Sequence, residues 1–170
     1  SIGIQSMNNN ILKWMNRSHD TNQVINGLNN TKVAGFENIN LDFIYGTPKN
    51  LSRDYKSELL EILKFNPAHL SCYHLTIEDG TYFGHLEKNK KIKRIEDDIS
   101  QQEFRWISEK LKSKNYQHYE ISNFAVQGKE SFLNSGGEKF TFIPCINDRD
   151  DWVNVMSRWI DEWALKEAAE

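Results

Sequence analysis

The order of short apolar strands and amphipathic helices in the first 76 residues is the feature that most constrains the fold. Strands that alternate with helices of this length are joined by right-handed crossovers into a parallel sheet or barrel. The sequence therefore predicts an α/β fold in which three parallel strands and their helices form part of a (β/α) barrel. The predicted order is strand 1–5, helix 8–16, helix 20–34, strand 39–45, helix 52–65 and strand 69–75.

Cap residues set the expected helix boundaries. Asp20 is the predicted N-cap of a helix that stops at Gly35, and Ser52 is the predicted N-cap of a helix that ends at Asn66–Pro67. Three strands alone leave both edges of the sheet open, so we expect further strands from upstream residues or from another chain.

The second half of the chain has a looser pattern, with a clear turn signal at Asp79–Gly80 and a break between Gly128 and Gly137. Apolar residues at helical spacing predict two long helices. The predicted order is irregular segment 77–93, helix 95–114, strand-like run 116–124, strand 139–143 and helix 150–168.

Composition excludes several classes of function. The formal net charge is −3 and the isoelectric point about 6.0, so we expect no nucleic-acid footprint and no polybasic membrane patch. The basic cluster Lys88–Arg94 is predicted to be a solvated loop. The two cysteines, Cys72 and Cys145, form no disulfide framework, and no apolar run can span a bilayer. A cytoplasmic location is the natural expectation.

Residues 40–48 form the candidate site. They read as a buried strand that carries one acid, Asp42, and ends at a Gly/Pro turn. A buried carboxylate needs a partner or a ligand, and parallel α/β folds bind ligands at the carboxyl ends of strands. Gln5 and Thr76 lie at or near other strand ends, and Arg17 could reach the same face. The set suits a zwitterionic or phosphate-bearing ligand, or a structural salt bridge.

Other chemistry-bearing residues form no recognisable site. The five histidines are scattered, and no pair has the spacing of a zinc site. His74 is interpreted as a hydrogen-bonded core histidine, and Cys72 as a small buried hydrophobe. The sequence holds no P-loop, dinucleotide-binding fingerprint or serine hydrolase order.

Five ordered motifs give the first three quarters of the chain a family resemblance. Residues 1 to about 126 resemble the radical S-adenosylmethionine (SAM) family that contains the oxygen-independent coproporphyrinogen III oxidase and the heme chaperone HemW. The motifs are SIGIQS at 1–6, RSHD at 17–20, NINLDFIYGTP at 38–48, LSCYHLTIEDGT at 70–81 and YEISNFA at 119–125. The last two favour the heme chaperone branch.

The resemblance implies a cofactor and a site. In that family the glutamine, arginine and aspartate of these motifs help to bind SAM, and they correspond to Gln5, Arg17 and Asp42 here. The family also holds a [4Fe–4S] cluster through a CxxxCxxC motif, which would lie upstream of these residues. Two distant cysteines cannot supply three thiolates. We therefore expect a truncated protein that is inactive alone, with heme or porphyrin as a further ligand.

The end of the chain carries a second resemblance. The family's His–Asn pair linked to heme reads Leu133–Asn134 here, and residues 132–168 look like the C-terminal strand and helix of ferrochelatase. No catalytic residue of ferrochelatase is carried over. The resemblances divide the chain into a partial radical SAM barrel, a HemW-like C-terminal region and a ferrochelatase-like segment, at 1–94, 95–128 and 129–170.

Two alternative functions remain open. The chain could be a non-catalytic interaction module that completes its sheet with another chain, including a homo-oligomer that pairs through the open edge at residues 1–5. It could also insert metal into porphyrin as ferrochelatase does.

Overall fold

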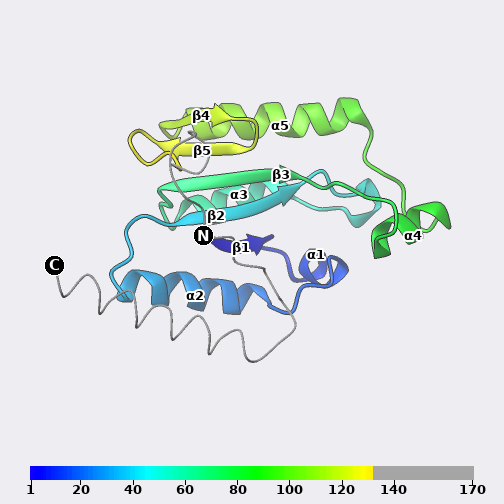
Figure 1. Ribbon diagram of the computed structural model, residues 1–170, viewed down its shortest axis with the longest axis horizontal. Helices are drawn as coiled ribbons and strands as arrows, with labels where there is room; N and C mark the ends of the chain where they lie inside the picture. The colour runs from blue at the N-terminus through cyan, green and yellow to red at the C-terminus, as the bar shows by residue number, and fades with distance from the viewer. Residues whose placement is uncertain (132–170) are drawn as a thin grey trace. The chain divides into compact units, whose positions relative to one another are not determined.

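A five-stranded sheet organises the part of the chain that the structure, a computed structural model, describes, which is residues 1–131. The strands lie in the order β1-β2-β3-β5-β4 (Figure 1). The first three are parallel to one another, as the sequence predicts, whereas β5 runs antiparallel to both β3 and β4. The strands are β1 (Ile2–Gln5), β2 (Asn40–Tyr45), β3 (His69–His74), β4 (Tyr116–Glu120) and β5 (Asn123–Val126).

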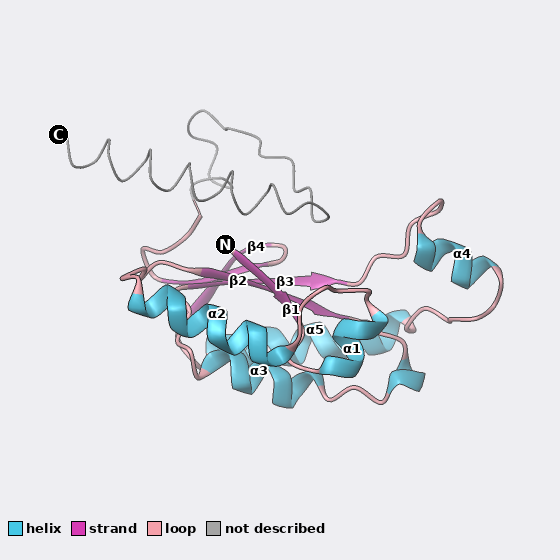
Figure 2. Ribbon diagram, turned by 90° about the horizontal axis from the view of Figure 1, so that it is seen from below, coloured by secondary structure: helices cyan, strands magenta, loops and turns pink. Residues whose placement is uncertain are grey.

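The helices gather on one side of this sheet. Figure 2 shows α1, α2, α3 and α5 on the same side, while α4 lies beyond the carboxyl end of β3 (Figure 1). This is the arrangement of crossover helices that pack on one face of a parallel sheet. The helices are α1 (Asn9–Trp14), α2 (Thr21–Val33), the 3₁₀ turn η1 (Lys49–Leu51), α3 (Tyr55–Leu63), α4 (Tyr82–Lys88) and α5 (Asp97–Lys112).

The core lies between the sheet and these helices. Alternate residues of β2 and β3 point into it, because successive side chains of a strand face opposite sides. Leu41 pairs with Leu70 and Phe43 with Cys72, and all four are almost fully buried. Burial of each large apolar side chain stabilises the fold by about 1.5–3 kcal/mol. The helices contribute Leu28, Leu59, Ile62, Ile107 and Leu111 to the same cluster.

The start of α2 confirms the predicted cap. Asp20 accepts a hydrogen bond from the backbone N–H of Gln23, and the Gln23 side chain accepts one from the backbone N–H of Asp20. This reciprocal pair satisfies two of the free amides at the helix start. The helix ends before Gly35, whose φ of +85° is the left-handed conformation that glycine adopts without strain.

Two local predictions are wrong. The N-cap of α3 is Asp54, which accepts a hydrogen bond from the backbone N–H of Ser57, whereas Ser52 ends η1 in a left-handed conformation. The segment predicted to be irregular contains α4, which Thr81 caps by accepting from the backbone N–H of Gly84. Both helices start at a side chain that satisfies a free amide.

The run at 116–124 is a hairpin rather than one strand. β4 and β5 pair antiparallel around a turn at Ile121–Ser122, and β5 covers the edge of β3 that the sequence leaves open. Among the described residues the edge of β1 has no partner strand.

Some predictions lie outside the described residues. Contacts divide the chain into two compact units, Ser1–Ser135 and Gly136–Glu170, and the strand predicted at 139–143 and the helix at 150–168 belong to the second. Within residues 1–131, every helix is too short or too polar to cross a bilayer.

Candidate ligand-binding site

The face of the sheet opposite the helices, called here the open face, carries polar side chains. Asn40 and Asp42 of β2 pair in register with His69 and Ser71 of β3, so all four lie on this face. No described helix covers it (Figure 2). A polar sheet face with no helix over it is suited to bind a ligand or a further part of a protein.

A hollow of about 510 Å³ lies on the open face. This volume is within the range of small-molecule sites in proteins. Its lining is polar and includes the single acid of β2, together with residues of the segment that follows β5. The lining residues are Ser1, Asn38, Asn40, Asp42, His69, Ser71, Tyr73, Asn123 and Gly128 to Ser131.

Asp42 has hydrogen-bond partners but no cationic one in the described part of the chain. Its Oδ1 accepts from Asn40 Nδ2 at 2.8 Å, and Ser1 Oγ lies 3.4 and 3.5 Å from its two oxygens. A carboxylate can accept about four hydrogen bonds, so it keeps free capacity toward the hollow. The sequence allows either a ligand for Asp42 or a structural salt bridge. Among residues 1–131 Asp42 has no salt-bridge partner.

Gln5 approaches Asp42 above Gly3. A Cβ built on Gly3 would lie 2.7 Å from Gln5 Nε2 and 3.9 Å from Asp42 Oδ2, so both polar groups face the same point. Gln5 has a φ of +60°, and the register with β2 shifts between Gly3 and Gln5. The irregular strand end and the missing side chain at Gly3 together make room for the amide.

Arg17 is not joined to this pair. No hydrogen bond or ion pair connects it to Asp42 within the described residues, and its buried Nε has no partner there. A buried donor without an acceptor costs about 1–3 kcal/mol, which a ligand oxygen would offset. Thr76, two residues after β3, is exposed and lies 3.5 Å from the carbonyl of His74. Like Gln5 and Arg17, it is not among the residues that line the hollow.

His69 is a site residue that the sequence reasoning missed. Its Nδ1 lies 2.5 Å from Asn40 Oδ1 and its Nε2 lies 2.6 Å from the hydroxyl of Tyr119. Burial lowers the pKa of the imidazole. His69 and Asn40 each stand at the start of a predicted strand, and this shared position is the signal that could identify the pair. Its use requires the register of β2 with β3, which the sequence does not supply.

A buried ion pair at the strand ends was also missed. Arg53 Nε donates to Glu58 Oε1 at 2.7 Å, and the same carboxylate accepts from Ser6 Oγ. The guanidinium also donates to the carbonyl of Ile44 at 2.7 Å. Every charged group is therefore paired, which is typical of a structural ion pair rather than a ligand site.

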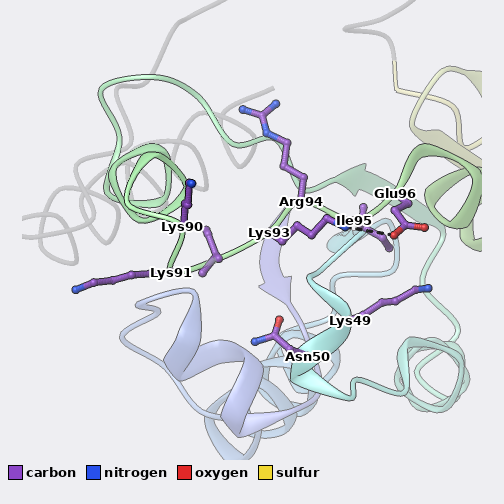
Figure 3. Close-up of a pocket in the computed structure, with 9 residues that line it drawn as sticks. Lys49, Asn50, Lys90, Lys91, Lys93, Arg94, Ile95 and Glu96 are labelled. Atoms are coloured by element: carbon purple, nitrogen blue, oxygen red, sulfur yellow. Dashed lines mark hydrogen bonds and ion pairs between the residues drawn. The ribbon is translucent and has the colours of Figure 1, made fainter.

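A second hollow, of about 360 Å³, lies where the loop after α4 meets η1 (Figure 3). Its lining is rich in Lys and Arg, but Figure 3 shows the ammonium groups of Lys49, Lys90 and Lys91 directed away from one another. Arg94 is held by Glu87, and Lys93 lies 3.5 Å from Glu96. The cations do not converge on one point, in agreement with the predicted solvated loop.

The donor set for metals is poor. Among residues 1–131 no group of three His, Cys, Asp or Glu side chains could hold an ion. Cys72 is buried, and burial raises the pKa of its thiol, so the prediction of a small buried hydrophobe is confirmed. With two cysteines in 170 residues, the chain does not fit a cluster that needs three thiolates.

No family model matches the chain, but curated relatives do. The heme chaperone HemW of Lactococcus lactis subsp. lactis is 34% identical over 131 residues, which are 77% of this chain and 35% of the relative. The HemW of Synechocystis sp. is 32% identical over 130 residues, 76% of this chain and 32% of the relative. The HemW of Bacillus subtilis is 28% identical over 131 residues, with 77% and 35% covered. The chain spans about a third of the length of these relatives.

A solved structure shares the fold. Coproporphyrinogen III oxidase (HemN) from Escherichia coli, described as a radical SAM enzyme, matches with a TM-score of 0.62 and 23% identity over 74% of this chain and 29% of the other. The resemblance to HemW and to this oxidase is thus confirmed. The ferrochelatase-like interpretation of residues 129–170 stays a prediction.

Proposed function

We propose that this chain, which is similar to heme chaperones HemW over three quarters of its length, supplies part of the SAM site of a HemW-like radical SAM protein. Gln5, Arg17 and Asp42 would be its SAM-binding residues. The observation that carries the proposal is Asp42, a half-buried carboxylate that faces a polar hollow and forms no ion pair with any of residues 1–131.

The three side chains offer complementary chemistry for a zwitterionic ligand. Asp42 accepts hydrogen bonds from ammonium or hydroxyl groups, and the Gln5 amide donates and accepts. The guanidinium of Arg17, whose Nε has no partner among residues 1–131, suits a carboxylate. These are the polar groups that an amino acid attached to a ribose presents. Gln5 Nε2 and Asp42 Oδ2 both lie near the position of a Cβ on Gly3, which supports a shared ligand contact for these two side chains. Arg17, in the segment after α1, would provide the third ligand contact.

Ligand binding tests this proposal directly. Isothermal titration of the 170-residue chain with SAM should show binding that Asp42→Asn weakens at least about tenfold, because a hydrogen bond to a charged group is worth about 1.5–3 kcal/mol. Asp98→Asn, which neutralises an exposed acid of α5, is the matched control and should leave the affinity unchanged. Absence of SAM binding by the unaltered chain would contradict the proposal.

Catalysis by the isolated chain is not part of the proposal. In the family the cluster supplies the electron that cleaves the sulfonium, and this chain does not provide the three thiolates. Anaerobic reconstitution with iron and sulfide should therefore give no cluster absorbance. Stoichiometric [4Fe–4S] on the isolated chain would show that the inference of inactivity is wrong.

A second candidate function is an interaction module. Its specific support is the edge of β1, which has no partner strand among the described residues and presents unpaired backbone groups to another chain. Size-exclusion chromatography with light scattering would show a dimer or larger assembly if two such edges pair. A clean monomer at high concentration would count against it.

The remaining expectations from the sequence stay proposals. Heme or porphyrin binding follows from the names of the relatives, and a cytoplasmic location follows from the cysteine usage. The division at residues 94 and 128 and the ferrochelatase-like end also stay predictions. A zinc-porphyrin fluorescence assay tests the last of these, and turnover would support metal insertion.

A further inference from the structure

A continuous series of hydrogen bonds, called here the His69 chain, runs from the segment after β5 to Asp42. The backbone N–H of Ser131 donates to the hydroxyl of Tyr119 at 3.1 Å, and this hydroxyl lies 2.6 Å from His69 Nε2. His69 Nδ1 lies 2.5 Å from Asn40 Oδ1, and Asn40 Nδ2 donates to Asp42 Oδ1 at 2.8 Å.

One arrangement of hydrogens satisfies the whole series. The Asn40 amide must turn its NH₂ toward the Asp42 carboxylate, because its oxygen would otherwise face a like charge. Asn40 Oδ1 then accepts from His69 Nδ1–H and from Ser71 Oγ, which lies 3.2 Å away. His69 Nε2 consequently accepts from the Tyr119 hydroxyl. In this arrangement of hydrogens the imidazole is neutral and is the Nδ1–H tautomer.

The surroundings of His69 favour this neutral state. His69 is 5% exposed and Ser71 is 2% exposed, although both lie on the open face. The carboxylates of Asp42 and Glu130 act to raise the pKa of the imidazole, whereas burial and the N-terminal ammonium lower it. Burial is the largest of these effects, and the pKa is lowered on balance.

We propose that His69 is a positioning residue for the ligand-binding carboxylate of Asp42. Through Asn40 it fixes Oδ1, so that Oδ2 remains on the side of Gly3 and Gln5, where the ligand would lie. Tyr119 in turn fixes His69. The consequence is that β4, none of whose residues lines the hollow, contributes to the affinity of the SAM site through Tyr119. This inference rests on the proposed function for its ligand.

Two tyrosines of β4 provide a matched test. The hydroxyl of Tyr119 belongs to the His69 chain, whereas that of Tyr116 donates to the carbonyl of Pro67 at 2.5 Å, away from Asp42. Each Tyr→Phe change removes one hydroxyl from the same strand. Tyr119→Phe should weaken SAM binding about three- to tenfold, the equivalent of one lost hydrogen bond, and Tyr116→Phe should leave it within about twofold. Equal effects of the two changes, or none, would overturn the proposal.

A second measurement separates this inference from the proposed function. If the unaltered chain binds no SAM, the proposed function fails, and ¹⁵N chemical shifts of the His69 imidazole then decide the inference. We expect the Nδ1–H tautomer in the unaltered chain and a higher pKa of His69 in Tyr119→Phe, because the neutral ring loses a donor. An Nε2–H tautomer, or an imidazole indifferent to Tyr119→Phe, would refute the positioning role.

Discussion

Arg53 and Glu58 form an ion pair in which the two side chains are only 3% and 6% exposed. The pair also binds the ends of two strands, since Glu58 accepts from the backbone N–H of Met7 and Arg53 donates to the carbonyl of Ile44. It therefore fixes the start of α3 against the carboxyl ends of β1 and β2, the end of the sheet where Gln5 lies.

Removal of one member of this pair should be costly. Glu58→Gln leaves the Arg53 guanidinium buried without its counter-charge, and we expect the free energy of unfolding to fall by about 3–5 kcal/mol. Urea denaturation measures the loss. The control is Glu61→Gln, because Glu61 pairs with Lys64 on the exposed side of the same helix and should contribute less than about 1 kcal/mol. If both variants lose the same free energy of unfolding, burial does not determine how much an ion pair contributes to stability.

Gly46 is required by both its conformation and its neighbour. Its φ is +77°, and an added Cβ would lie 2.5 Å from the ring of His74. Gly46→Ala should destabilise the fold by about 2–5 kcal/mol through backbone strain and overpacking. Gly80→Ala, at φ +79° with open space around it, should cost only the strain, about 1–2 kcal/mol. Thermal unfolding of Gly46→Ala with and without His74→Ala separates the two contributions, and no recovery in the double variant would contradict the assigned clash.

The stability of the fold should fall in mild acid. Burial lowers the pKa of His69 below the ordinary value of about 6.5, and partial desolvation lowers the pKa of His74, which is exposed and not the hydrogen-bonded core histidine that the sequence predicts. The unfolded chain therefore binds more protons than the folded chain below about pH 6.5. The stability that depends on neutral histidines is fully present above about pH 6.5 and is lost as the pH falls toward the pKa values of the folded protein. Denaturant midpoints between pH 7.5 and 5 measure the slope. His69→Gln and His74→Gln should each flatten it, and an unchanged slope in both would exclude these residues as the cause.

Cys72 should be unreactive in the folded protein. Its side chain is buried, and burial raises the pKa of the thiol, so almost no thiolate forms near neutral pH. In a Cys145→Ser background, a chromogenic disulfide reagent should label Cys72 only after unfolding in guanidinium. Rapid labelling under native conditions would show that the β2–β3 region opens readily.

The parallel part of the fold could be predicted from the sequence because its signals are local. The three strands, the helix capped by Asp20 and the turn at Gly46 all depend on residues near one another in the chain. The acid of β2 was also identified, and the structure places Asp42 on a polar hollow.

The features that were missed depend on contacts between distant segments. The turn at Ile121–Ser122 carries no glycine, proline or asparagine, so the sequence pattern predicts one continuous strand where the structure has a hairpin. His69 meets Asn40 only through the β2–β3 register, and Tyr119 of β4 reaches His69 only because β5 joins β4 to β3. Side-chain pairing of this kind has no periodic signature in the sequence.

The pairing of β5 with β3 also has a consequence for biosynthesis. Ser71 pairs with Asn123, about fifty residues later in the chain. At a synthesis rate of 5–20 residues per second, the edge of β3 would wait roughly 3–10 seconds for its neighbour to leave the ribosome. During that interval the nascent parallel strands carry an exposed edge that includes the apolar Leu70 and Cys72. The arrival of the hairpin is therefore the step that ends the vulnerability of the nascent sheet to aggregation at this edge.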